Sequence, residues 1–112
     1  MKLTAAITAQ NTSIYICDIH QRRGANDWFA SVMLAGTFGG GTVTLQISND
    51  GGTTKATVNQ DGTATAASAT AAGVLNVRSG YPSNLGDEPL QLYATIATAT
   101  NPSINITAYD NR

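Results

Sequence analysis

Residues 42–47, with the sequence Thr-Val-Thr-Leu-Gln-Ile, constrain the fold more than any other stretch of the chain. Their apolar side chains fall on one face and their polar side chains on the other, which is the two-residue period of a half-buried strand. The following Asp50-Gly51 pair supplies the positive φ that a tight hairpin needs. We therefore expect a β-hairpin whose return strand begins at Thr53, and a fold of the all-β class.

Short apolar segments separated by turn residues continue along the whole chain. Such spacing is typical of sandwiches and barrels, and 112 residues suit one domain over 1–112. We expect a single β-sandwich or jelly-roll-like domain of about eight short, mostly antiparallel strands. The expected strands are 3–9, 13–19, 28–35, 42–48, 53–59, 74–78, 90–98 and 103–109.

Three segments leave alternatives open. Residues 28–35 are apolar on both faces, which favours a central strand, but a helical turn also fits so short a pattern. Residues 63–72 contain only Thr, Ala and Ser, so they suit an edge strand, a surface arm or a segment ordered by a partner. Residues 1–11 offer only Leu3 and Ile7 as anchors and are a candidate N-terminal arm. We expect one of these last two segments to be held by contacts between subunits.

Composition argues against two classes of partner. Charged residues make up 12% of the chain, the formal net charge is −1, and Arg22-Arg23 is the one adjacent basic pair. Because phosphate binding needs clustered cations, we expect no nucleic-acid role. No stretch approaches the roughly 20 apolar residues of a membrane span, and no secretory signal is recognisable at the start. The weakly charged surface, rich in Thr and Ala, suits either subunit packing or a solvated sheet face.

Residues 48–55 resemble the Asp-box hairpin, Ser-x-Asp-x-Gly-x-Thr-Trp, which occurs in sialidase propellers and in many unrelated β proteins. Lys55 departs from that pattern, where an aromatic residue is usual. We expect the Asp50 carboxylate to accept backbone N–H bonds within the turn, a structural role without catalysis. The residues of this structural turn are Ser48, Asp50, Gly51, Gly52 and Thr54.

Other reactive residue types are too sparse for an active site. Cys17 is the only cysteine and lies in an apolar strand, so a buried thiol is expected. His20 is expected at the surface, and Asp87-Glu88 as solvated loop charges, because zinc and calcium need more ligands than these. No Gly-x-Ser-x-Gly elbow is present. We expect no catalytic residues, no cofactor and no metal.

The aromatic residues offer a different kind of site. A sugar-stacking platform could be drawn from Trp28 and the four tyrosines at 15, 81, 93 and 109. Trp28 is expected in the core. Tyr81, between Gly80 and Pro82, is the expected exposed residue for a ligand or an interface.

A longer segment, residues 36–54, resembles small virion proteins of tailed bacteriophages. It reads Gly-Thr-Phe-Gly-Gly-Gly-Thr-Val-Thr-Leu and, after Gln-Ile, Ser-Asn-Asp-Gly-Gly-Thr-Thr. The later stretches Leu75-Asn76-Val77-Arg78 and 103–108 are similar to the same group. The resemblance implies a β-sandwich-like fold and a structural role in the virion as a head decoration (cement) protein, a fibre component or a neck component. It implies no catalytic residues.

These observations favour a non-enzymatic virion protein, made in the host bacterial cytoplasm, that binds the assembled phage head. We expect a homo-oligomer, with a trimer favoured, and the major capsid protein or another virion protein as partner. The alternative is a carbohydrate-binding or receptor-binding β-sandwich module of a fibre or adhesin, with Tyr81 as its best anchor.

Overall fold

The structure is a computed structural model of the chain. It describes residues 2–9, 12–20, 27–80 and 90–110. These residues form strands and no helix, so none of them lies in a helix long and apolar enough to cross a membrane. The strands are β1 (Lys2–Ile7), β2 (Ser13–Ile19), β3 (Asp27–Thr37), β4 (Thr42–Ser48), β5 (Ala56–Thr57), β6 (Ser68–Ala69), β7 (Gly73–Gly80), β8 (Leu90–Ala97) and β9 (Ser103–Asp110).

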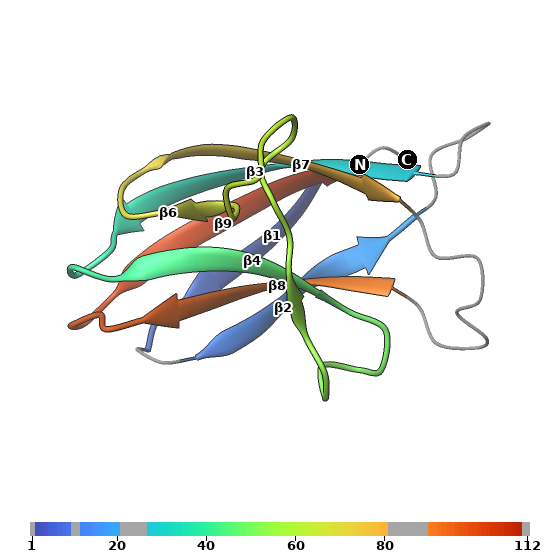
Figure 1. The fold of residues 1–112 in the computed structure, drawn as a ribbon. Helices are drawn as coiled ribbons and strands as arrows, with labels where there is room; N and C mark the ends of the chain where they lie inside the picture. Colours follow the sequence, from blue (N-terminus) through green and yellow to red (C-terminus); the bar gives the residue numbers. More distant parts are fainter. Residues whose placement is uncertain (1, 10–11, 21–26, 81–89, 111–112) are drawn as a thin grey trace.

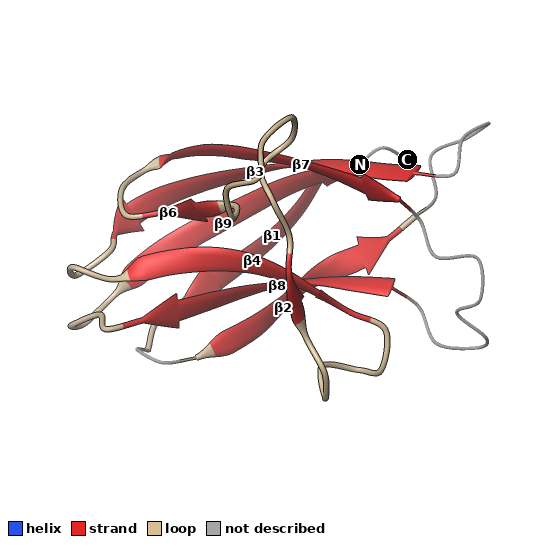
Figure 2. Cartoon of the chain, in the orientation of Figure 1, coloured by secondary structure: helices blue, strands red, loops and turns tan. Residues whose placement is uncertain are grey.

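The strands form two antiparallel sheets that face each other as two layers (Figures 1 and 2). One sheet has the order β1–β9–β3–β7 and the other β2–β8–β4–β5, with β6 also paired to β4. The pairing is nested, because β1 pairs with β9, β2 with β8, β3 with β7 and β4 with β5. The chain is thus one long antiparallel ribbon folded over on itself. The predicted all-β sandwich is confirmed.

One hydrophobic core lies between the sheets, and β3 shows how the sequence builds it. Trp28, Ala30, Val32 and Leu34 are buried, whereas the residues between them face outward and are partly or fully exposed. This alternation is that of a strand with one buried face, so the helical alternative for 28–35 is wrong. The buried face also holds Trp28 in the core, as predicted.

The turn after β4 is longer than predicted. Ile47 pairs with Ala56 and Gln46 with Thr57, so the return strand does not begin at Thr53. The reason is local. The side chains of Ser48 and Asp50 accept the backbone N–H groups of Gly52 and Thr54, and these amides then have no hydrogen left for a ladder with β4.

Residues 58–67 leave β4, reach β7 of the other sheet and return to β4 at one side of the sandwich (Figure 1). The Val58 N–H donates to the Leu45 carbonyl at 3.2 Å, and the Asp61 N–H donates to the Asn76 carbonyl on β7 at 2.8 Å. Ala67 is fully buried, and its N–H donates to the Val58 carbonyl at 2.8 Å. The middle of residues 63–72 is therefore anchored within its own chain, and contacts of this segment with another subunit stay a prediction.

The N-terminal residues also differ from the expected arm. Lys2–Ile7 pairs along its whole length with β9, and Ile7 is completely buried. Ladder hydrogen bonds and this apolar anchor place the segment at the edge of the sheet as β1.

Candidate functional site

The outer face of the β2–β8–β4 sheet carries two tyrosines among short polar side chains. We call this surface the tyrosine face. The register of the three strands arranges it as three rows of cross-strand neighbours. From β2 through β8 to β4, the rows are Ser13–Thr95–Thr44, Tyr15–Tyr93–Gln46 and Asp18–Gln91–Ser48.

A β-bulge brings Tyr15 and Asp18 onto this one face. Tyr15 pairs with Tyr93 and Cys17 pairs with Leu92, so Ile16 is an extra residue in β2. In a regular strand, residues three positions apart point to opposite faces. Here the side chains of Ile16 and Cys17 are both buried, so the residues on either side of them, Tyr15 and Asp18, share the outer face.

Hydrogen bonds fix the polar groups around Tyr15. Its hydroxyl donates to Asp18 Oδ1 at 2.9 Å, and Gln91 Nε2 donates to the same oxygen at 3.4 Å. The Tyr93 hydroxyl in turn donates to Gln91 Oε1 at 3.0 Å. Partial burial, followed by the hydrogen bond to Asp18, raises the pKa of Tyr15 to about 12. Tyr15 is therefore a neutral phenol at physiological pH.

The two tyrosine rings differ in exposure. Tyr15 is 47% exposed, whereas Tyr93 is only 9% exposed. The rings meet edge to face, with centroids 6.0 Å apart and an interplanar angle of 69°. Lys55 Nζ lies 5.3 Å from the centroid of the Tyr93 ring, within the range of a cation–π contact. Tyr93 is thus a buried support, and Tyr15 is the ring that a ligand could contact.

The loop of residues 48–55 is built around the side chains of Ser48 and Asp50. The Ser48 hydroxyl donates to Asp50 Oδ1 at 2.7 Å and accepts the Gly52 N–H at 2.9 Å. Asp50 Oδ1 also accepts the Thr54 N–H at 2.8 Å. The bond from Thr54, followed by the bond from Ser48, holds the pKa of the Asp50 carboxyl below its usual value. Gly51 completes the turn with a φ of 74°.

This loop packs against the tyrosine face. Gly52 has a φ of 93°, and a Cβ atom placed on it would lie 2.8 Å from the Tyr93 hydroxyl oxygen. The Lys55 ammonium donates to the Gly52 carbonyl at 2.8 Å and so closes the loop over Tyr93. The residues predicted as a structural turn therefore support the buried tyrosine and present no reactive group of their own.

The outer face of the other sheet carries several large apolar side chains, and the Ser31 hydroxyl, which donates to Asn76 Oδ1 at 2.7 Å, lies among them. Met33, Val74 and Tyr109 are 43%, 53% and 44% exposed. Met33 pairs directly with Val74 on β7, and Tyr109 on β9 pairs with Ser31, two residues before Met33. The half-buried ring of Phe29 extends this surface towards Arg78. We call the surface formed by Phe29, Met33, Val74 and Tyr109 the Met33 face.

Charges on the Met33 face lie at one end of it. The Arg78 guanidinium carbon lies 5.6 Å from the centroid of the Phe29 ring. Asp27 and Arg78, the charged residues of β3 and β7, both lie at the Phe29 end of this sheet. Around Met33 the cross-strand neighbours are Val74 and Thr107, which are uncharged.

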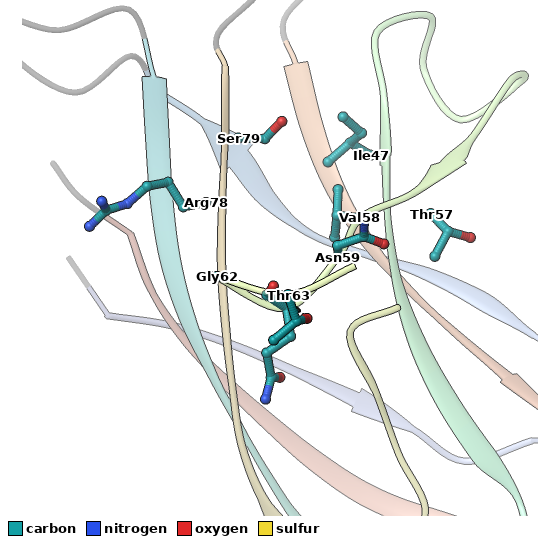
Figure 3. A pocket seen from close by; sticks show the side chains of 9 residues that line it. Ile47, Thr57, Val58, Asn59, Gly62, Thr63, Arg78 and Ser79 are labelled. Atoms are coloured by element: carbon teal, nitrogen blue, oxygen red, sulfur yellow. Dashed lines mark hydrogen bonds between the residues drawn. The ribbon is translucent and has the colours of Figure 1, made fainter. Parts of the chain in front are cut away.

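A cleft of about 310 Å³ lies where residues 58–63 cross between β4 and β7 (Figure 3). Its lining includes Ile47 from one sheet and Ser79 from the other. Arg78, the one ionisable residue among the described lining, points its guanidinium away from Ile47 (Figure 3). Gln60 Oε1 is buried there and accepts no hydrogen bond from any described residue. The described lining thus offers polar contacts without an acid–base pair.

The remaining candidate residues from the sequence lie away from the tyrosine face or outside the described residues. The Cys17 thiol is buried as predicted, and His20 is half-buried after the end of β2. Tyr81, Arg22-Arg23 and Asp87-Glu88 lie outside the described residues. Within the described ranges, no three His, Cys, Asp or Glu side chains come together as metal ligands.

The sequence identified Tyr15 and Tyr93 as aromatic candidates but did not predict that they are neighbours. Their pairing depends on the register between β2 and β8. The one local signal is the unbroken apolar run Ile14-Tyr15-Ile16-Cys17, which interrupts the alternation at the point where the bulge occurs.

Comparison with known proteins supports the architecture. No family model and no curated protein matches the sequence. Among solved structures, a carbohydrate-binding module, CBM4, is similar over 92% of this chain, with a TM-score of 0.54 and 12% identity. The chain spans 66% of that structure's length, slightly less than two thirds. At this identity the similarity is one of fold alone.

Two further structures score lower. A Bacillus endospore appendage protein, from a family of disulfide-linked pili, is similar over 96% of this chain and 82% of its own, with 16% identity and a TM-score of 0.48. The PRD1 vertex protein P5 is similar over 96% of this chain and 94% of its own, with 11% identity and a TM-score of 0.46. No function is inferred from these two similarities.

Proposed function

We propose that this chain is a non-enzymatic structural protein of a phage virion, a decoration or cement protein that binds the assembled head as a homo-oligomer. The resemblance of residues 36–54 to small virion proteins of tailed phages supports this role. The nested strand order supports it as well, because a jelly roll, an architecture used by viral capsid and lectin domains, would have such nested pairs. A fold alone does not fix a function, so a surface feature has to carry the proposal.

The observation that carries the proposal is the Met33 face. Large exposed apolar side chains that adjoin one another mark interaction sites on soluble proteins. Burying this surface against a neighbour would contribute about 25 cal/mol for each Å² of apolar area removed from water. Because Met33 and Val74 have uncharged surroundings, identical copies can meet there without repulsion between like charges. We favour a trimer.

The action of such a protein on a capsid is thermodynamic. A ligand that binds only the assembled shell stabilises that shell by RT ln(1 + [L]/Kd), about 2.7 kcal/mol per site at a hundredfold excess over Kd. The protein would be made in the host bacterial cytoplasm and would contact the major capsid protein or another virion protein. It needs no catalytic group for this role.

Particles of a phage that encodes this chain test the proposal. Purified virions should contain the chain at a fixed ratio to the major capsid protein, as measured by quantitative mass spectrometry. Virions made with Met33→Lys should contain less of it, whereas Tyr15→Ala, on the opposite sheet, should be incorporated normally. Absence of the wild-type chain from purified virions would rule out the proposed role.

A further inference from the structure

The tyrosine face has no part in the assembly proposed above, and its chemistry suits a ligand of another kind. We propose that it is a binding site for an uncharged polysaccharide, with the Tyr15 ring stacked on one pyranose ring. The neighbouring amides and hydroxyls would bind the sugar hydroxyls. This site is independent of the virion role and would serve a free protein equally well.

Tyr15 has the properties of a stacking residue. Its ring is about half exposed and apolar, while its hydroxyl is already bonded to Asp18 at 2.9 Å. The edge contact with Tyr93, at 6.0 Å between centroids, holds the ring from the other side. A side chain fixed by two contacts loses little further freedom when a ligand binds. The β-bulge at Ile16 places the Tyr15 ring and the Asp18 carboxylate on the same face of the sheet.

Polar groups surround Tyr15 at the spacing of the sheet. The Thr95 hydroxyl lies 2.7 Å from Gln46 Oε1 and 3.2 Å from Ser13 Oγ. A glutamine amide has two N–H donors besides its oxygen, and a hydroxyl both donates and accepts. Sugar hydroxyls also donate and accept, so they match such a surface. Neighbouring strands lie about 4.8 Å apart, so the three strands present these groups across about 10 Å.

The charges on this face favour an uncharged ligand. Asp18 lies in one row, and the Lys55 ammonium lies beside Tyr93. The exposed Asp50 carboxylate is hydrogen-bonded to Ser48 at the edge of the face, so two carboxylates and one ammonium are present and no excess of positive charge can attract a polyanion.

A protein partner fits the tyrosine face less well. Its three rows contain two tyrosines and seven polar residues but no aliphatic side chain. The buried centre of a protein interface is mostly apolar, on the order of 65%, and the tyrosine face lacks the aliphatic side chains for such a centre. A pyranose ring, with an apolar C–H face and a polar rim, needs only one exposed ring among hydrogen-bonding groups.

Affinity electrophoresis provides the test, with the full chain run through gels that contain a soluble polysaccharide. The probes are hydroxyethyl cellulose, dextran, mannan and galactan as uncharged polymers, and alginate as a polyanion. We expect retardation by at least one uncharged polymer and none by alginate. Tyr15→Ala should weaken the binding at least about tenfold, while Tyr15→Phe, which keeps the ring, should weaken it less.

Asn105→Ala is the control, because Asn105 is exposed on the opposite sheet and lies outside both the tyrosine face and the Met33 face. It should bind like the wild type, and thermal unfolding should show that each variant is folded. No retardation by any uncharged polymer would overturn the proposal, and so would equal losses in Tyr15→Ala and Asn105→Ala. Binding to alginate alone would show that the ligand class is wrong. Self-association lost in Tyr15→Ala but kept in Met33→Lys would make this face a subunit interface instead. If the chain is absent from virions but binds sugar through Tyr15, the virion role fails and this site stands.

Discussion

Tyr15 and Asp18 are hydrogen-bonded at 2.9 Å on one face of β2 although they are three residues apart in the sequence. The extra residue Ile16 makes this contact possible, because without a bulge their side chains would lie on opposite faces. The two outer surfaces of the sandwich differ. One is polar around Tyr15, and the other exposes the apolar side chains of Met33 and Val74.

The raised pKa of Tyr15 predicts a specific alkaline behaviour. The folded protein favours the neutral phenol, with a pKa of about 12 against an ordinary value of 10.0. The stability that this shift contributes is fully present below pH 10.0 and is lost as the pH rises to about 12. The unfolding free energy of wild type relative to Tyr15→Phe should therefore fall across this window. Phenolate absorbance supplies a second readout, and a Tyr15 phenolate forming at its ordinary pKa would disprove the effect.

Asp50 predicts the opposite trend, at acid pH. Its pKa is lowered from 3.8 by the Thr54 N–H, followed by the Ser48 hydroxyl. The stabilisation is present above pH 3.8 and is lost as the pH falls below that value. The difference in unfolding free energy between wild type and Asp50→Asn should shrink over the same fall in pH. A difference that stays constant with pH would show that the ionised form has no special role in the loop.

Alanine substitutions at the adjacent glycines 51 and 52 measure two costs separately, that of a strained backbone and that of a close side-chain contact. Gly51→Ala places a side chain at a φ of 74° in open space, and it should cost about 1 kcal/mol of unfolding free energy. Gly52→Ala adds a contact of 2.8 Å with the Tyr93 hydroxyl, so it should cost at least about 1 kcal/mol more. Urea unfolding of the two variants measures the difference. Equal costs would mean that the loop does not pack on Tyr93 as described.

Hydrogen exchange tests how residues 63–72 are held. The Ala67 amide donates to the Val58 carbonyl at 2.8 Å beneath a fully buried side chain, so it should exchange slowly even at concentrations where the protein is monomeric. Ala71 and Ala72 are exposed outside any strand and should exchange fast. Fast exchange of Ala67 in the monomer, slowed only on assembly, would restore the partner-dependent interpretation.

Periodicity predicted the sandwich because most of its strands have one buried face. In β4 the inward residues are apolar and the outward ones polar, so alternation alone located this strand and its core side, whereas the apolar outward residues of β3 left a helical turn open. The turn after β4 was only partly predictable. The sequence indicated that Asp50 would bind backbone amides, but not that these bonds would delay the return strand to Ala56.

The tyrosine face could not be assembled from the sequence alone. Its rows depend on which residues of β2, β8 and β4 lie opposite one another, and that register is set by contacts between segments far apart in the chain. The bulge at Ile16 shifts this register by one residue. The burial of Ala67 was not predicted for a similar reason. Its small side chain is buried only because residues 58–67 lie over one side of the sandwich.

Light scattering coupled to gel filtration, over a range of protein concentrations, bears on assembly through the Met33 face. We expect wild type to elute as one homo-oligomer, with a mass three times that of the 11.6 kDa chain. Met33→Lys should elute as a folded monomer at the same concentration, while Tyr15→Ala should remain assembled. A wild-type protein that stays at 11.6 kDa up to its solubility limit, or a Met33→Lys variant that assembles normally, would show that this face does not join subunits.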